Sequence, residues 1–178
     1  MPQPTKKTPL ICLLILLPAL SHAAQTCKTN IPATTPTSQF TDNGNGTITD
    51  TKTGLMWKRC SEGQVWSNGG CARLGKGGAY YRWQVAMTRT QTLNKAGGFA
   101  GYADWRMPSV EELQSIVEKQ CSAPAINLTV FPDTPSSAEF WSSSLPANYG
   151  YYAQSISFRN GKVQTSLNGH NLRLRLVR

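Results

Sequence analysis

Apolar and polar residues alternate through the C-terminal third of the chain, a pattern typical of half-buried antiparallel strands. The alternation covers residues 152–158, 163–167 and 172–177, and Asn-Gly dipeptides that favour tight turns separate these segments. In the last segment, leucines at alternate positions are interleaved with Arg173 and Arg175. The sequence therefore predicts an antiparallel sheet whose final strand has one apolar face and one basic face.

Two segments in the middle of the chain have the periodicity of helices. Across residues 83–96 an apolar stripe follows the i, i+3, i+4, i+7 spacing, and Gly97 ends the predicted helix. A second helix is predicted to begin after Ser109, whose hydroxyl can cap it while Glu112 completes a capping box. We expect this second helix to end near Lys119.

Strands are predicted on both sides of the two helices. Residues 40–57 read as a β-meander with Gly-containing turns, and residues 140–144 as one strand before the alternating segments. Glycines stand at the alternate positions after Asp42, so we expect a turn there and no calcium loop. Residues 59–79 are too irregular to assign. The order of strands, two helices and strands predicts an α+β fold.

Residues 1–23 have the features of a secretory signal peptide. A pair of lysines precedes an apolar run of roughly 11 residues, well short of the ~20 that a membrane span needs. Small residues favour cleavage after Ala23, with cleavage after Ala24 as the alternative. The expected division is a signal peptide at 1–23, a Thr/Pro-rich N-terminal arm at 24–38 and one domain at 39–178.

Four cysteines remain after the leader is removed, and an even number is typical of disulfides in an oxidising compartment. Three pairings are possible. We favour Cys60–Cys71, which closes a short Gly-rich loop, and Cys27–Cys121, which ties the arm to the domain. No Cys-x-x-Cys pair supports zinc binding. We therefore expect an extracytoplasmic protein of a bacterium, periplasmic, secreted or on the cell surface.

The titratable residues offer little for catalysis. Lys and Arg exceed Asp and Glu by 18 to 9, and after the leader the one histidine is His170, in a turn. The sequence has no phosphate-binding loop and no nucleophile elbow. Glu111 and Glu112 leave a carboxylate-pair enzyme as an alternative, although Glu112 already has a capping role. We expect no enzyme, no cofactor and no metal site.

The C-terminal region combines tyrosines with serines, asparagines and cations, a mixture suited to contact with ligands. Tyrosine supplies stacking area, and cations attract anionic groups. Nucleic acid is not an expected partner of an exported protein. The predicted ligand-binding residues are Tyr149, Tyr151, Tyr152, Arg159, Lys162, Arg173 and Arg175.

Several blocks of sequence, in order, resemble one family of bacterial exported proteins. They lie at residues 40–50, 53–57, 101–109, 131–135 and 140–144, and the third reads Gly-Tyr-Ala-Asp-Trp-Arg-Met-Pro-Ser. The string is similar to the Legionella collagen-like protein (Lcl) C-terminal domain family. The similarity extends over nearly the whole chain after the leader.

The resemblance implies a C-type-lectin-like α+β fold, with two helices packed on antiparallel sheets and disulfides as staples. The namesake of the family is an adhesin domain that binds sulfated glycosaminoglycans. The block at 105–108 also resembles formylglycine-generating enzymes, but the catalytic cysteine motif of those enzymes has no match here. The motifs of calcium-dependent lectins are also missing, which argues against sugar binding through calcium.

The sequence thus predicts a non-enzymatic, adhesin-like domain that recognises an anionic polysaccharide or a protein through its C-terminal β face. The alternative is an accessory subunit of a cell-envelope assembly, such as a pilus or a secreted matrix. No membrane span is expected, and the oligomeric state stays open.

Overall fold

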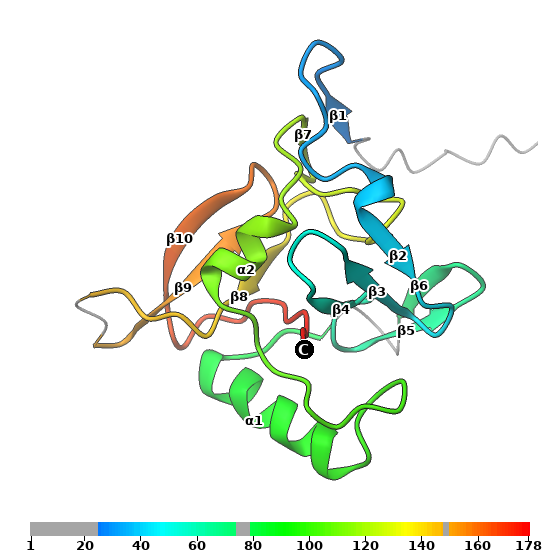
Figure 1. The fold of residues 1–178 in the computed structure, drawn as a ribbon. Helices are drawn as coiled ribbons and strands as arrows, with labels where there is room; N and C mark the ends of the chain where they lie inside the picture. The colour runs from blue at the N-terminus through cyan, green and yellow to red at the C-terminus, as the bar shows by residue number, and fades with distance from the viewer. Residues whose placement is uncertain (1–24, 74–78, 148–149) are drawn as a thin grey trace, which may run out of the picture.

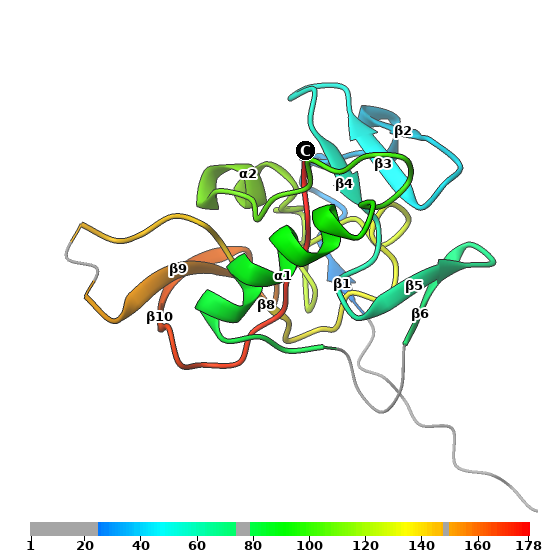
Figure 2. The ribbon, with the colours of Figure 1, turned by 90° about the horizontal axis from the view of Figure 1, so that it is seen from below.

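The computed structural model describes residues 25–73, 79–147 and 150–178; the predicted signal peptide and Tyr149 lie outside these ranges. Within them the chain forms an α+β fold in which small antiparallel sheets and two helices pack into one body (Figure 1). The β9–β10 ribbon and the β5–β6 ribbon project on opposite sides of that body, as Figures 1 and 2 both show.

The strands pair in four antiparallel sheets within the described residues. The first joins β1 (Thr26–Cys27) to β7 (Cys121–Ser122). The predicted meander is confirmed as β2 (Phe40–Asp42), β3 (Thr47–Asp50) and β4 (Met56–Lys58), preceded by the 3-10 turn Thr37–Gln39. The third sheet is β5 (Gln64–Ser67) with β6 (Gly70–Arg73), and the fourth has the order β10–β9–β8, from β8 (Glu139–Trp141), β9 (Tyr152–Ser157) and β10 (Lys162–Leu167).

The β5–β6 hairpin lies in the segment that the sequence left unassigned. Its turn is the dipeptide Asn68-Gly69, with positive φ angles of 50° and 78°, as a two-residue hairpin turn requires. Trp66 in β5 packs against Gly46, where an added Cβ would come within 2.9 Å of the Trp66 Cβ. Because Asn-Gly favours such turns, the Asn68-Gly69 dipeptide could have located this hairpin in the sequence.

Both predicted helices are present. α1 (Trp83–Lys95) matches its predicted range, and α2 (Val110–Ser115) begins with the predicted capping box between Ser109 and Glu112. α2 ends earlier than the expected position near Lys119. The chain leaves the helix there because Val117 forms an antiparallel β-bridge with Ile126. The carboxylate of Glu118 then binds the N-terminal arm at Thr35.

The C-terminal segment, residues 172–178, is the main departure from the predicted fold. It runs through the middle of the molecule (red in Figures 1 and 2), with segments hydrogen-bonded along both edges. Lys58 and Glu62 donate backbone hydrogen bonds to it on one side, and Val177 exchanges two with Arg106 on the other. From Arg173 to Val177 the side chains are all buried, so both faces of this part of the segment are covered.

Two groups of buried side chains form the core. One gathers aromatic residues from several elements, among them Trp57, Phe131, Phe140 and Phe158. The other packs Ala86 of α1 and the C-terminal Leu174 and Leu176 together with Trp105 and Trp141. Burial on this scale contributes roughly 1.5–3 kcal/mol for each large apolar side chain. In the described part of the chain, no helix has the length and apolar character that crossing a membrane would require.

Both predicted disulfides form, Cys27–Cys121 and Cys60–Cys71. The second is buried and anchors the β5–β6 hairpin next to β4. The first joins directly opposite residues of β1 and β7 and fastens the N-terminal arm. The arm is therefore not a free extended segment, because strand pairing and a covalent bond both hold it to the body.

Candidate ligand-binding surface

The structure distributes the predicted ligand-binding residues over three places. Tyr151 and Tyr152 lie where β9 begins, and Arg159 and Lys162 lie at the turn where β9 passes into β10. The six residues of β9 separate these two ends by about 17 Å. Arg173 and Arg175 lie in the interior, in the C-terminal segment. Those of the predicted residues that the structure describes therefore do not form one continuous face.

Arg175 is fully buried, which corrects its predicted place on a basic outer face. Its Nη1 donates to the backbone carbonyls of Lys58 and Arg59, and its Nη2 donates to the hydroxyl of Thr134 at 3.1 Å. The guanidinium carbon lies 4.8 Å from the ring centre of Phe131, so a cation–π contact adds to these bonds. Burial, with a smaller contribution from the charge of Arg173, lowers the pKa of Arg175 to about 9, and the group stays protonated at pH 7.

Arg173 is also withdrawn from solvent, with 4% of its surface exposed. Its Nη2 donates to the hydroxyl of Tyr80 at 2.9 Å, and its guanidinium stacks on the ring of Tyr80. Tyr80 lies between this arginine and solvent, and more than half of its own surface is exposed. The alternating pattern could not reveal that Arg173 is buried. Here a segment with both faces covered has the same alternation as a strand with one face in solvent.

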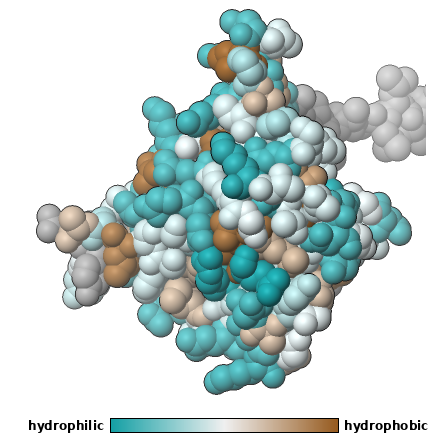
Figure 3. Space-filling view, viewed as in Figure 1, coloured by the Kyte–Doolittle hydropathy of each residue, from teal (hydrophilic) through white to brown (hydrophobic). Residues whose placement is uncertain are grey.

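The tyrosine end of the sheet consists of Tyr151 and Tyr152 with the exposed leucines Leu145 and Leu167. Tyr151 has 82% of its surface exposed, and Leu167 lies directly opposite Tyr152 in the pairing of β9 and β10. Figure 3 shows brown, hydrophobic atoms at this tip, on a face that is otherwise largely hydrophilic. This end is an apolar and aromatic surface without a cation in β9.

Arg159 and Lys162 are exposed at the other end of the ribbon, as predicted. The turn that carries them is closely held. Ala123 donates a backbone hydrogen bond to the carbonyl of Arg159 at 2.9 Å. Gly161 has φ +73°, and an added Cβ would lie 2.4 Å from Val117 Cγ1, so only glycine fits there. The two cations are thus presented by a fixed turn packed against the segment after α2.

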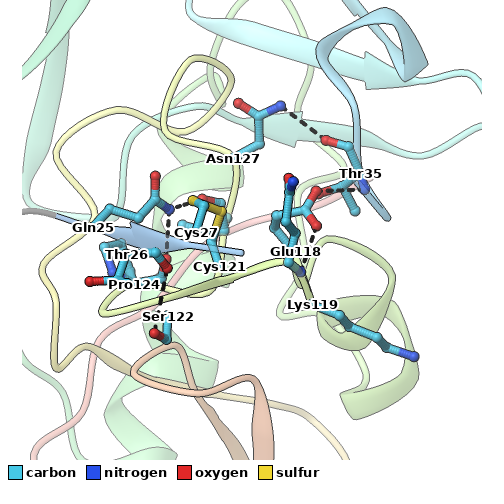
Figure 4. The surroundings of a disulfide bond; sticks show 12 residues. Gln25, Thr26, Cys27, Thr35, Glu118, Lys119, Cys121, Ser122, Pro124 and Asn127 are labelled. Carbon is cyan, nitrogen blue, oxygen red and sulfur yellow. Dashed lines mark hydrogen bonds between the residues drawn. A yellow bond between two sulfur atoms is a disulfide. The ribbon is translucent and has the colours of Figure 1, made fainter. Parts of the chain in front are cut away.

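The N-terminal arm lies beside the same segment (Figure 4). Cys27 is bonded to Cys121, and Lys28 donates its amide hydrogen to the carbonyl of Gln120 at 2.9 Å. Gln25 extends the contact, because its side-chain Nε2 donates to the carbonyls of Pro124 and Ile126. The arm, the segment 118–123 and the β9–β10 turn therefore form three adjacent backbone layers.

Glu118 holds the next part of the arm. Its carboxylate accepts hydrogen bonds from the amides and the hydroxyls of Thr34 and Thr35, at 2.8 to 3.1 Å, and from the amide of Gln120. Burial raises the pKa of this carboxyl, but the hydrogen bonds outweigh that effect and the pKa lies below its usual value. Sequence reasoning missed Glu118 because its partners in the arm, Thr34 and Thr35, are more than 80 residues away.

Two exposed lysines of these layers, Lys28 and Lys119, were also missed. The signal for them was present in the sequence. Lys28 follows Cys27 directly and Lys119 precedes Cys121 by two residues. The predicted disulfide between those cysteines therefore already implied that the two lysines lie near each other.

The family model of the Lcl C-terminal domain matches residues 46–178. The chain belongs to the Lcl C-terminal domain family. A comparison with curated proteins gave no significant match. The matched range begins at the β2–β3 turn and includes Cys60, Cys71 and Cys121. Cys27 lies before it, so in this Lcl C-terminal domain one disulfide links the matched region to the arm.

The acidic residues considered for catalysis are engaged in structural contacts in this Lcl C-terminal domain. Glu112 accepts two hydrogen bonds from the Arg106 guanidinium, at 2.7 and 2.6 Å, and one from the amide of Ser109. The Arg106 bond, opposed by burial, holds the pKa of Glu112 below its usual value. Glu111 accepts from the hydroxyl of Ser109, so both carboxylates belong to the cap of α2.

Two further surface features are a lone histidine and a hollow beside the arm. His170 is exposed in the turn after β10. Within the described ranges, no cluster of three or more His, Cys, Asp or Glu residues has the arrangement needed to hold a metal ion. A shallow hollow of about 360 Å³ lies between the arm and the body, and its wall includes Gln25, Gln120 and Leu128.

Proposed function

We propose that this Lcl C-terminal domain is a non-enzymatic, adhesin-like binding domain for an anionic polysaccharide. The observation that carries the proposal is the exposure of Arg159 and Lys162 on the fixed β9–β10 turn, with no ion pair to either among the described residues. An anionic ligand can reach both cations without breaking an existing contact. The namesake of the family is an adhesin domain that binds sulfated glycosaminoglycans, and this agrees with the choice of ligand.

The distribution of acidic groups supports the proposal. Asp42, Glu62, Asp104 and Glu112 each form an ion pair with an arginine or lysine of another segment. Glu118 is buried and bound to the arm. Without the two lysines of the predicted signal peptide the formal charge is +7, and among the described residues several exposed cations, Arg159 and Lys162 included, have no ion pair. Such a surface attracts polyanions over distances of about 10 Å at moderate ionic strength.

Two finer assignments belong to the same proposal. The α+β arrangement, with two helices against antiparallel sheets and a disulfide near each ribbon, is consistent with a C-type-lectin-like fold. The two disulfides favour an extracytoplasmic location, because such bonds persist in oxidising compartments. An adhesin-like domain would meet its polysaccharide there.

Binding to heparin, used as a probe sulfated polysaccharide, tests the proposal. The wild-type protein should bind, and binding should weaken several-fold when the salt concentration rises from 0.1 to 0.5 M, since salt screens exposed charges. The double variant R159Q/K162Q should bind more weakly at low salt. The control K52Q/R82Q removes two exposed cations from other parts of the surface and should bind like wild type. Absence of wild-type binding, or equal loss in both variants, would contradict the proposal.

A second candidate function rests on the tyrosine end. Its exposed tyrosines and leucines are the kind of surface that anchors protein partners. The chain would then act as an accessory subunit of a cell-envelope assembly. The variant Y151A/L167A should lose a stoichiometric partner in a pull-down from envelope extract while retaining heparin binding. Loss of heparin binding in that variant would instead assign the tyrosine end to the polysaccharide site.

A further inference from the structure

We infer that the anion-binding surface continues from the β9–β10 turn across β7 onto the N-terminal arm, where Lys119 and Lys28 supply two further cations. We call Lys28, Lys119, Arg159 and Lys162 the cationic end. The inference rests on the proposed function and adds to it that the Cys27–Cys121 disulfide assembles the site from two separate parts of the chain.

Backbone contacts place the cationic end on adjacent segments. Arg159 accepts a hydrogen bond from Ala123, just after β7, and Lys28 donates one to Gln120, just before β7. Neighbouring hydrogen-bonded segments lie about 4.8 Å apart, so the arm and the turn are about 10 Å apart across β7. Side chains as long as lysine and arginine span such intervals.

The exposed charges on these segments all have one sign. All four cations are exposed, and none has an ion pair among the described residues. The one carboxylate on segment 118–123 is Glu118, which is buried and occupied by Thr34 and Thr35. Figure 4 shows the Lys119 side chain directed away from this carboxylate. The acidic group thus fixes the arm and leaves Lys119 unpaired.

The spacing of the cations selects the class of ligand. A single phosphate or sulfate could contact one or two of these side chains, because they come from three separate segments. A linear polyanion with repeated charges can contact all of them at once. Each exposed charge contributes little by itself, so useful affinity requires several such contacts together.

The disulfide makes the arm contribution dependent on redox state. Cys27 is exposed, whereas Cys60 and Cys71 are buried, so a dithiol should reduce Cys27–Cys121 first. In that reaction the dithiol gives two electrons and two protons, the S–S bond becomes two thiols, and the dithiol closes to its own disulfide. Residues 25–30 are then held by only a few hydrogen bonds, and Lys28 is no longer fixed beside Lys119.

Heparin binding by charge variants tests the inference. The variant K28Q/K119Q should bind about threefold to tenfold more weakly than wild type at low salt, comparable with R159Q/K162Q. The control K52Q/R82Q should bind like wild type. Wild-type affinity in K28Q/K119Q, together with a loss in R159Q/K162Q, would overturn the inference and leave the proposed function intact. Failure of wild type to bind would instead contradict the proposed function.

Removal of the Cys27–Cys121 disulfide provides a second, independent test. The variant C27S/C121S should lose as much affinity as the single variant K28Q, because Lys119 stays in place on the body, and adding K28Q to it should cost little more. A near-UV circular dichroism spectrum that matches wild type would show that the body is still folded. If C27S/C121S is folded and binds with wild-type affinity, the assembled site is excluded. If it is not folded, selective reduction of the wild type, followed by mass spectrometry of alkylated cysteines, gives the same comparison.

Discussion

The carboxylate of Glu118 accepts hydrogen bonds from both the amide and the hydroxyl of Thr35, at 2.8 and 3.0 Å. It makes the same pair of contacts with Thr34 through its other oxygen. One acidic side chain therefore holds two consecutive residues of the arm, in addition to the covalent bond at Cys27. The position of the arm depends on the charge and the geometry of this group.

We expect Glu118→Gln to destabilise the protein by about 2 kcal/mol. The amide nitrogen that replaces one carboxylate oxygen is a donor and would face the donors of Thr34 or Thr35. Urea unfolding measures the change. Glu111→Gln is the matched control, because Glu111 is exposed and accepts one hydrogen bond, from Ser109. An equal loss of stability in the two variants would contradict this role for Glu118.

Stability should fall on acidification because the pKa values of Glu118 and Glu112 are lowered in the folded protein. A lowered pKa means that the folded state favours the charged form. The stabilisation is complete above the ordinary glutamate value of about 4.3 and is lost as the pH falls through the lower folded values. Urea midpoints measured between pH 3 and 7 should show this decline. The decline should be smaller in Glu118→Gln, and an identical profile would argue against the assignment.

Arg175→Ala should cost about 3–5 kcal/mol, because it leaves the carbonyls of Lys58 and Arg59 without their donor and opens a cavity beside Phe131. Arg175→Met fills more of the space and should cost less. Thermal unfolding gives both values. Heparin affinity of folded Arg175→Met should equal that of wild type, and a selective loss of affinity would return Arg175 to the ligand-binding residues.

Gly161→Ala should be more destabilising than Gly44→Ala. Both glycines have positive φ, +73° and +74°, so both substitutions incur the left-handed penalty of about 1–2 kcal/mol. Only at Gly161 would the new Cβ collide with another side chain, Val117, while the space beside Gly44 is open. Denaturant titration of the two variants measures the difference. Equal costs would show that the turn moves away from Val117 without penalty.

Local signals in the sequence were sufficient for several elements. The capping box at Ser109 and Glu112, the meander before Trp57 and the two cysteine pairs each depend on short-range chemistry or on a small number of combinations. The C-terminal segment was different. Its alternation predicts a strand, but whether Arg175 points into solvent depends on which segments lie against it, and those come from residues 56–62 and 106.

The candidate site was predicted in part for the same reason. Arg159 and Lys162 follow from the turn dipeptide between two alternating segments, and both are exposed as expected. Lys119 joins them from the segment before β7, and Lys28 from the arm that the Cys27–Cys121 bond and the β1–β7 pairing hold beside it. A site assembled from distant parts of a chain cannot be read from local pattern, although a correctly predicted disulfide indicates where to look.

The path of residues 172–178 has a consequence for how the molecule acquires its shape. Both core groups include side chains of this segment, Val177 in one and Leu176 in the other. Neither core group is complete without the side chains of this segment. Neither half of the body is therefore expected to fold by itself. We therefore expect shortened chains that end before Leu172 to stay unfolded as a whole, and the complete chain to gain its order in one cooperative step.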